Sequence, residues 1–155
     1  MAFKVFISYS TRDLTRTRQV KDLLEAAGAQ VFVAKYSVPP GAELAPKIFS
    51  SIQACDLFVL LWSHHAKKSE WVPQEIGIAR GLNKPIIPVV LHQSTELPGF
   101  LKGIKYHPIY EDPEKSLAWL HRIVAIKVSE KSKREGLVWL GVSGVLLWLL
   151  AQDKR

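Results

Sequence analysis

The stretch LFVLLW, residues 57–62, holds six apolar residues in a row. A strand with one exposed face alternates apolar and polar residues, whereas a strand that is covered on both faces does not. The run PIIPVVL at residues 85–91 has the same character apart from Pro88, which suggests a strand end or a position without a ladder donor. Both runs are typical of the central strands of a parallel sheet, because crossover helices bury both faces of such a sheet.

Strand-like and helix-like segments alternate on either side of these two runs. Further strands are predicted at residues 4–9 and 29–34, with a weak edge strand at 106–110. Helical spacing predicts a helix that ends at Gly28 and further helices at residues 43–54, within 67–81, and at 112–128. The predicted fold is therefore α/β: a flavodoxin-like, five-stranded parallel sheet with helices on both faces, plus a C-terminal apolar helix.

Composition limits the function classes. A chain of 155 residues suits one compact domain with an appendage, and a single cysteine, Cys55, excludes an intramolecular disulfide. The N-terminus enters a strand-like run directly, so no signal peptide is expected. The net charge is +7, but the basic residues are scattered except in KVSEKSKRE at 127–135. A basic segment just before an apolar run favours a membrane-proximal collar over a nucleic-acid groove.

The C-terminal segment GLVWLGVSGVLLWLLA, residues 136–151, has sixteen residues without a charge. As a helix it would be about 24 Å long, somewhat short of a hydrocarbon core of about 30 Å. Trp139 and Trp148 lie near its ends, as interfacial aromatic residues do. We therefore predict a domain at 1–128, a juxtamembrane linker at 129–135, a transmembrane anchor at 136–151 and a charged tail at 152–155. This arrangement would hold a cytoplasmic domain at the inner (cell) membrane; the alternative is an apolar helix that mediates oligomerisation.

The stretch KKSEWVPQEIGIARG, residues 67–81, contains the main candidate for chemistry. Glu75 follows Trp71 by four residues and shares a mostly apolar helical stripe with Ile78 and Leu82. One interpretation is an exposed charge that offsets the helix dipole, worth about 0.3–1 kcal/mol. The other is a carboxylate held at the edge of a pocket, since this helix begins just past the carboxyl end of a predicted strand.

Other common catalytic patterns are missing from the sequence. It contains neither a P-loop nor a dinucleotide-binding glycine fingerprint. His64 and His65 are adjacent and lack a nearby Cys or His at ligand spacing, so no metal site is expected. Ser8 and Ser10 lack a G-x-S-x-G context, which argues against acyl transfer. Cys55 is expected to pack as a small apolar residue.

Three motifs occur in an order that resembles the Toll/interleukin receptor (TIR) domain family. They are KVFISYSTRD, VPPGAELAPKIFSSIQACDLFVLLWS and SEWVPQEIGIA, and the likeness covers roughly residues 3–126. The conjunction of F-I-S-Y, a P-G loop after the second strand, and S-x-W-x-x-x-E is the specific part. One departure is the loop that reads AKYSVPPG, where many members carry a polar residue, so the residues that bind the adenosine end of a substrate are left open.

The resemblance implies one of two activities. Some family members are non-catalytic adaptors that act by homotypic association, whereas others, including bacterial antiviral members, cleave the nicotinamide–ribose bond of NAD+. For the enzymes it implies a homo-oligomer, NAD+ as substrate without a further cofactor, and a downstream effector that senses the product. The implied catalytic residue is Glu75. The implied substrate-binding residues are Tyr9, Ser10, Thr11 and Trp71, and the implied assembly loop, residues 36–42, contains Tyr36, Pro39, Pro40 and Gly41.

The chemistry of this bond suits a single carboxylate. Its cleavage develops positive charge on the ribose, which a fixed carboxylate such as Glu75 would stabilise. Nicotinamide is already a cationic leaving group, so no general acid is needed. Trp71, one helical turn away, offers a π-face for the ring. Water would give ADP-ribose, an internal hydroxyl a cyclic product and another acceptor a conjugate, and the sequence leaves this choice open.

Overall fold

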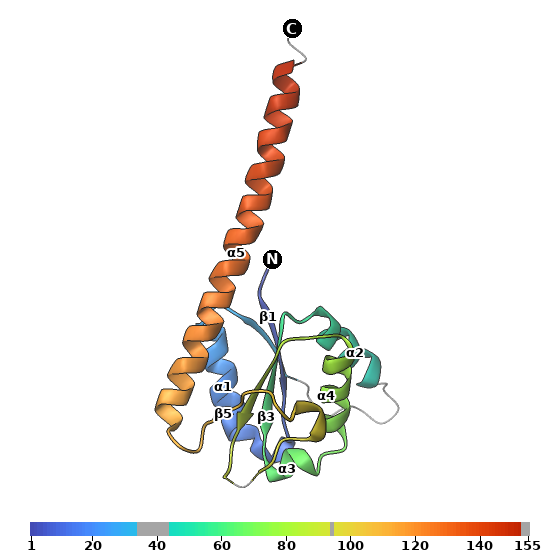
Figure 1. Ribbon diagram of the computed structural model, residues 1–155, viewed down its shortest axis with the longest axis vertical. Helices are drawn as coiled ribbons and strands as arrows, with labels where there is room; N and C mark the ends of the chain where they lie inside the picture. The colour runs from blue at the N-terminus through green and yellow to red at the C-terminus, as the bar shows by residue number, and fades with distance from the viewer. Residues whose placement is uncertain (34–43, 94, 153–155) are drawn as a thin grey trace.

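The structure is a computed structural model that describes residues 1–33, 44–93 and 95–152 (Figure 1). Its centre is a five-stranded sheet in the order β2-β1-β3-β4-β5, and every neighbouring pair is parallel. The strands are β1 (Lys4–Ser8), β2 (Gln30–Val33), β3 (Leu57–Trp62), β4 (Ile86–Val90) and β5 (His107–Pro108). The predicted parallel α/β sheet is confirmed.

The helices form a layer on each face of the sheet, as Figure 1 shows. One layer holds α1 (Leu14–Ala26) and the first part of α5 (Pro113–Gln152), and the other holds α2 (Leu44–Ala54) and α4 (Trp71–Gly81). Three short helices complete the fold: η1 (Thr11–Asp13), α3 (His64–Lys67) and η2 (Gly99–Leu101).

Both faces of β3 are buried, as the run LFVLLW predicts. Successive side chains of a strand point to opposite faces. Val59 accordingly packs with the α1 and α5 residues Leu24 and Val124, while Phe58 packs with Ile76 of α4. Cys55 lies in this second cluster at 4% exposure, which confirms its predicted packing role.

Two local predictions also agree with the structure. Gly28 ends α1 with φ +94°, a conformation that favours glycine, and its N–H donates to the carbonyl of Glu25. Pro88 lies inside β4 and pairs with Leu60 of β3. The short strand β5 pairs only with Val89 and Val90, so Pro88 lies beyond its end.

Helix α5 is 40 residues long and continues far past the sheet (Figure 1). Two ion pairs tie its middle to the start of the chain and to the amino end of β3. Lys131 Nζ lies 2.8 Å from Asp56 Oδ2, and Glu135 Oε2 lies 2.6 Å from the N-terminal ammonium. The domain boundary predicted at residue 128 is thus not a helix end, and the division into domain, linker and tail stays a prediction.

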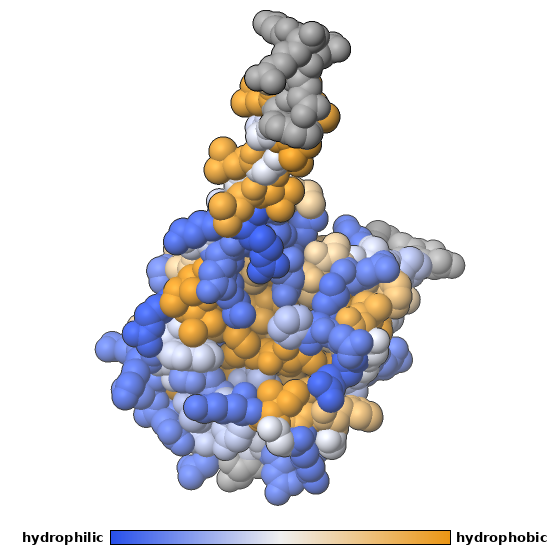
Figure 2. Space-filling model, turned by 45° about the horizontal axis from the view of Figure 1, so that its top comes forward, coloured by the Kyte–Doolittle hydropathy of each residue, from blue (hydrophilic) through white to orange (hydrophobic). Residues whose placement is uncertain are grey.

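Beyond Glu135 the helix carries exposed apolar side chains, which form the apolar projection in Figure 2. The predicted membrane anchor is nevertheless wrong: no helix among the described residues is long and apolar enough to cross a bilayer. The apolar run supplies about 24 Å against a hydrocarbon core of about 30 Å. It is also the end of a helix whose preceding turns, at 127–135, are charged. The predicted location at the inner membrane is withdrawn with the anchor.

Candidate active site

The strand order reverses between the carboxyl ends of β1 and β3, which makes this the topological switch point of the sheet. The chain passes from β1 outward to β2 and then returns to β3 on the other side of β1. In open parallel sheets, such a reversal of direction opens a crevice where ligands bind. The last residue of β1 is Ser8, and Ser63 directly follows β3; both side chains are completely buried.

Glu75, in the second turn of α4, lies next to this switch point. Its side chain is 1% exposed, and its Oε2 accepts a hydrogen bond of 2.5 Å from Ser8 Oγ. The interpretation of Glu75 as an exposed charge that offsets the helix dipole is therefore wrong. A buried carboxylate is costly unless hydrogen bonds compensate it, so its retention here points to a specific role.

Tyr9 directly follows β1 and lies close enough to Glu75 to interact with its charge. The residue is 4% exposed. Burial raises the pKa of the Tyr9 hydroxyl, and the negative charge of Glu75 raises it further. The Tyr9 hydroxyl therefore stays protonated near neutral pH and lies within the field of the Glu75 carboxylate.

A second polar contact joins the segment after β1 to the segment after β3. Ser63 Oγ donates to Asp13 Oδ2 at 2.5 Å and accepts from Ala66 N at 3.0 Å, which caps α3. The backbone carbonyl of Asp13 accepts a bond of 2.9 Å from Thr17 Oγ1, and Thr17 is buried. The loop after β1 is thus fixed to the loop after β3.

The other predicted site residues differ in their burial and in their contacts. Ser10 is buried and its hydroxyl accepts from Arg12 N at 3.3 Å, so it caps η1. Thr11 begins η1 and is exposed. Trp71 begins α4, where Ser69 Oγ accepts from its backbone N–H at 3.3 Å, and its partly buried ring packs against the core cluster of Ile76. The predicted assembly-loop residues, Tyr36, Pro39, Pro40 and Gly41, lie outside the described residues.

The structure therefore brings Glu75 and Tyr9 together, and it adds residues that were not predicted for the site. These are Ser8, Asp13 and Ser63. The signal that could have found them is a hydroxyl directly at the carboxyl end of an apolar strand, in FISYS and in LLWS. Such a serine is buried by the strand's own packing and must bond to a neighbouring polar group.

This arrangement suits chemistry that stabilises a developing positive charge. A buried carboxylate acts in a low-dielectric site, where its field is stronger than in water. Within the part of the chain that the structure describes, no group of three His, Cys, Asp or Glu residues could hold a metal ion.

Comparisons with known proteins agree with this fold. A family model described as "TIR domain" matches residues 5–124. The crystal structure of the TIR domain of the Toll-related receptor TRR-2 from Hydra magnipapillata is similar with a TM-score of 0.64 and 26% identity, covering 77% of this chain and 96% of that one. A prokaryotic SEFIR domain is similar in fold, with a TM-score of 0.56 and 21% identity over 78% of this chain and 91% of the other.

One curated relative carries an enzyme name. A probable 2′ cyclic ADP-D-ribose synthase from Brachypodium distachyon, BdTIR, is 33% identical over 89 residues. The match covers 56% of this chain but 40% of that protein, less than half of the relative's length.

Proposed function

This chain belongs to the TIR domain family, and from that premise we propose that it cleaves the nicotinamide–ribose bond of NAD+. In this proposal Glu75 is the catalytic carboxylate, and Tyr9, Ser10, Thr11 and Trp71 lie around the substrate. NAD+ is a substrate, and no further cofactor takes part. The proposed setting is bacterial immunity, where the product would act on a downstream effector or NAD+ would be depleted.

The observation that carries the proposal is the buried Glu75 carboxylate at the topological switch point between β1 and β3. It is 1% exposed and held by Ser8, which is itself fixed in the sheet. A surface glutamate would gain little from such a position, whereas a charge that must face a developing cation gains from being fixed before the reaction begins.

The proposed reaction moves one electron pair in its first step. The bond between ribose C1′ and the nicotinamide nitrogen breaks, and its electron pair neutralises the pyridinium ring. The ribose becomes an oxocarbenium ion, which the negative charge of Glu75 stabilises. Water then attacks C1′ and releases a proton to give ADP-ribose, or a hydroxyl of the same molecule attacks to give a cyclic product.

The comparisons support this proposal at the level of the domain. BdTIR is named as a probable cyclic ADP-D-ribose synthase, and a synthase of that product must break the same glycosidic bond. The buried position of Glu75 and the name of BdTIR both support cleavage of the nicotinamide–ribose bond. A cyclic product is thus one of the outcomes that the assay must resolve.

The test is direct. The full chain at high concentration is incubated with NAD+, and the products are identified by mass spectrometry alongside Glu75→Gln. We expect nicotinamide with ADP-ribose, or with a cyclic ADP-ribose that is lighter by one water, from the wild type only. If concentrated wild-type protein released no nicotinamide, the proposal would fail and the non-catalytic adaptor would take its place.

A further inference from the structure

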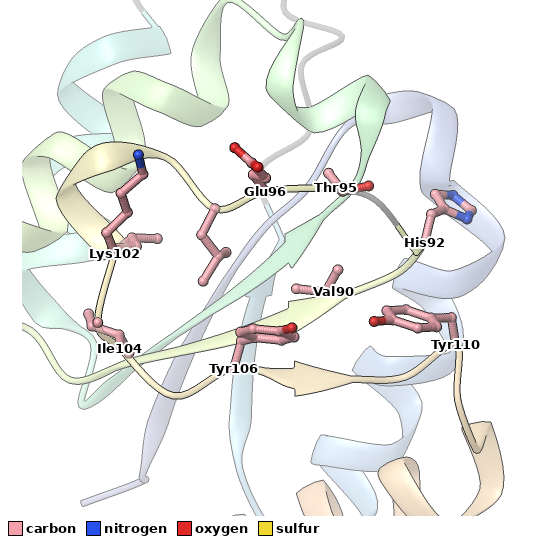
Figure 3. A pocket seen from close by; sticks show the side chains of 11 residues that line it. Val90, His92, Thr95, Glu96, Lys102, Ile104, Tyr106 and Tyr110 are labelled. Atoms are coloured by element: carbon pink, nitrogen blue, oxygen red, sulfur yellow. The ribbon is translucent and has the colours of Figure 1, made fainter.

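A cavity of about 440 Å³ lies beside the end of β4, between residues 95–104 and the two tyrosines that flank β5 (Figure 3). Val90 at the end of β4 and Leu101 of η2 line it, and they are 2% and 0% exposed. Its size falls in the range of small-molecule sites. Its lining residues come from 90–110, so the cavity is separate from Glu75 on α4 and Ser8 on β1.

Two tyrosines give the cavity an aromatic wall. Figure 3 shows Tyr106 and Tyr110 on the same side, with their hydroxyls pointing toward one another. Burial raises the pKa of the Tyr110 hydroxyl, and the neighbouring Tyr106 raises it further, partly through a hydrogen bond between the two side chains. Tyr106 is 46% exposed although it lines a hollow. An aromatic ring with this exposure contributes little to the core and leaves a π-face for a ligand.

The opposite wall is held in place by contacts to β3 and α3. Trp62 Nε1 donates to the carbonyl of Glu96 at 2.8 Å. Thr95 is 9% exposed, and its Oγ1 lies 3.5 Å from His64 Nε2. Because the side chain of Trp62 is buried in the core, its bond to the carbonyl of Glu96 holds this wall in place before any ligand binds, which reduces the entropic cost of binding.

The charges around the cavity are balanced. Lys102 and Glu96 both lie along its lining, and Figure 3 places them on the stretch that leads into and out of η2. A cation and a carboxylate in the same lining favour neither an anionic nor a cationic ligand strongly. The remaining lining consists of apolar side chains, Gly103, two tyrosine hydroxyls, a threonine hydroxyl and the imidazole of His92.

We propose that this cavity binds an uncharged, planar heteroaromatic ring of nucleobase size, with the ring stacked on Tyr106. The tyrosine hydroxyl pair would bond to the ring's polar edge. Two sources share this chemistry, the base of a nucleoside and free nicotinamide. The inference goes beyond the proposed NAD+ cleavage and does not depend on it.

The test measures binding in the Glu75→Gln background, where no turnover disturbs the titration. Adenosine, AMP and nicotinamide are titrated by calorimetry into the full chain with and without Tyr106→Ala. Tyr106→Ala removes the base–aromatic stacking and should lower the affinity for adenosine or nicotinamide about tenfold to a hundredfold. Tyr106→Phe keeps the π-face and should retain most of the affinity. AMP should bind no more tightly than adenosine, because Glu96 offsets Lys102.

Phe100→Ala is the matched control, since Phe100 is 65% exposed in the same segment and does not line the cavity. It should bind as the parent does. Affinity that survives Tyr106→Ala would place the ligand elsewhere, for instance at the Glu75 site, and would overturn the inference. Absence of binding by both adenosine and nicotinamide at millimolar concentration would overturn it as well, whatever the NAD+ assay shows.

Discussion

Ser8 Oγ and Glu75 Oε2 lie 2.5 Å apart and join the end of β1 to the second turn of α4. Both residues are buried, and Ser8 is fixed by the pairing of β1 with β3. The sheet therefore sets the position of the carboxylate, and α4 alone does not. A catalytic charge held in this way needs no rearrangement during the reaction, which is the basis of electrostatic preorganisation.

Glu75→Gln should abolish NAD+ cleavage and leave the fold intact. Glutamine keeps the volume and an oxygen acceptor for Ser8 but removes the charge that faces the developing cation. We expect kcat to fall by at least about a hundredfold, measured as nicotinamide release. Glu70→Gln is the control, because Glu70 precedes α4 and is exposed. Near-normal turnover in Glu75→Gln would refute the assignment of Glu75.

Ser8→Ala should lower activity through the position of Glu75. Ser8 is a positioning residue, and its hydroxyl bond stabilises the ionised carboxylate. Its loss should reduce kcat by roughly tenfold, within the range of a lost hydrogen bond to a charged group. KM should stay near its wild-type value, because Ser8 acts on the carboxylate and not on substrate binding. A purely structural effect would lower thermal stability without this selective fall in kcat.

Trp71→Ala should mainly raise KM, and Trp71→Phe should retain more activity. The Trp71 ring packs partly against the core cluster of α4, so the alanine variant also loses some stability. Assays well below the unfolding transition separate the two effects. The same KM in the phenylalanine and alanine variants would show that no aromatic face is needed at this position.

The alternation of strands and helices was readable because each central strand is apolar on both faces. The run LFVLLW predicts a strand that is buried on both faces, and the structure buries all six of its residues. For residues 136–151, hydrophobicity alone does not distinguish a membrane span from an exposed helix end. The short length of the run and the charged turns at 127–135 can be read from the sequence, whereas its continuity with α5 and the exposure of its side chains appear only in the structure.

The candidate site was only partly predictable for a similar reason. The spacing of Trp71 and Glu75 along one helix is local and can be read from the sequence. The Ser8–Glu75 and Asp13–Ser63 bonds join residues that are 67 and 50 positions apart. Such pairs arise from the strand order, and a single sequence carries no signal for their geometry.

Removing residues 136–155 should leave the domain folded. The last contacts between α5 and the body involve Lys131 and Glu135, which such a truncation keeps. Truncation after Glu130 should instead lose about 1 kcal/mol, because the partly buried Lys131–Asp56 pair disappears. Thermal unfolding of the two truncations measures the difference. Aggregation of the chain that ends at residue 135 would show that the apolar end belongs to the core.

The difference between these truncations should also depend on pH. Burial opposes ionisation of Asp56, but the bonds from Lys131 and from the Lys4 N–H lower its pKa below the ordinary value. A lowered pKa in the folded state adds stability above the unfolded pKa of about 4, and this stability is lost as the pH falls through the folded value. In acid, the chain that ends at Glu135 should therefore no longer be more stable than the chain that ends at Glu130. An advantage that persists there would not come from this pair.

Specific activity should rise with protein concentration, because the proposed site gains from a neighbouring chain. The resemblance that assigns Glu75 also assigns residues 36–42, with Pro39, Pro40 and Gly41, as an assembly loop. A neighbouring loop over the crevice would exclude water and strengthen the field of Glu75 at the ribose. We therefore expect Gly41→Pro to suppress turnover while Glu75 stays intact.

The apolar end of α5 provides a way to separate local concentration from direct contact at the site. It leaves the domain at the amino ends of β1 and β3, where Lys131 bonds to Ala2 O and Asp56, and so lies at the opposite edge from Ser8 and Ser63. Exposed apolar side chains there, such as Leu140 at 71%, can associate without blocking the crevice. Truncation after Glu135 should then shift the rise in specific activity to higher concentration without lowering its plateau. Light scattering on the same samples reports the assembly, and a specific activity that stays constant from dilute monomer upward would show that a single chain is competent.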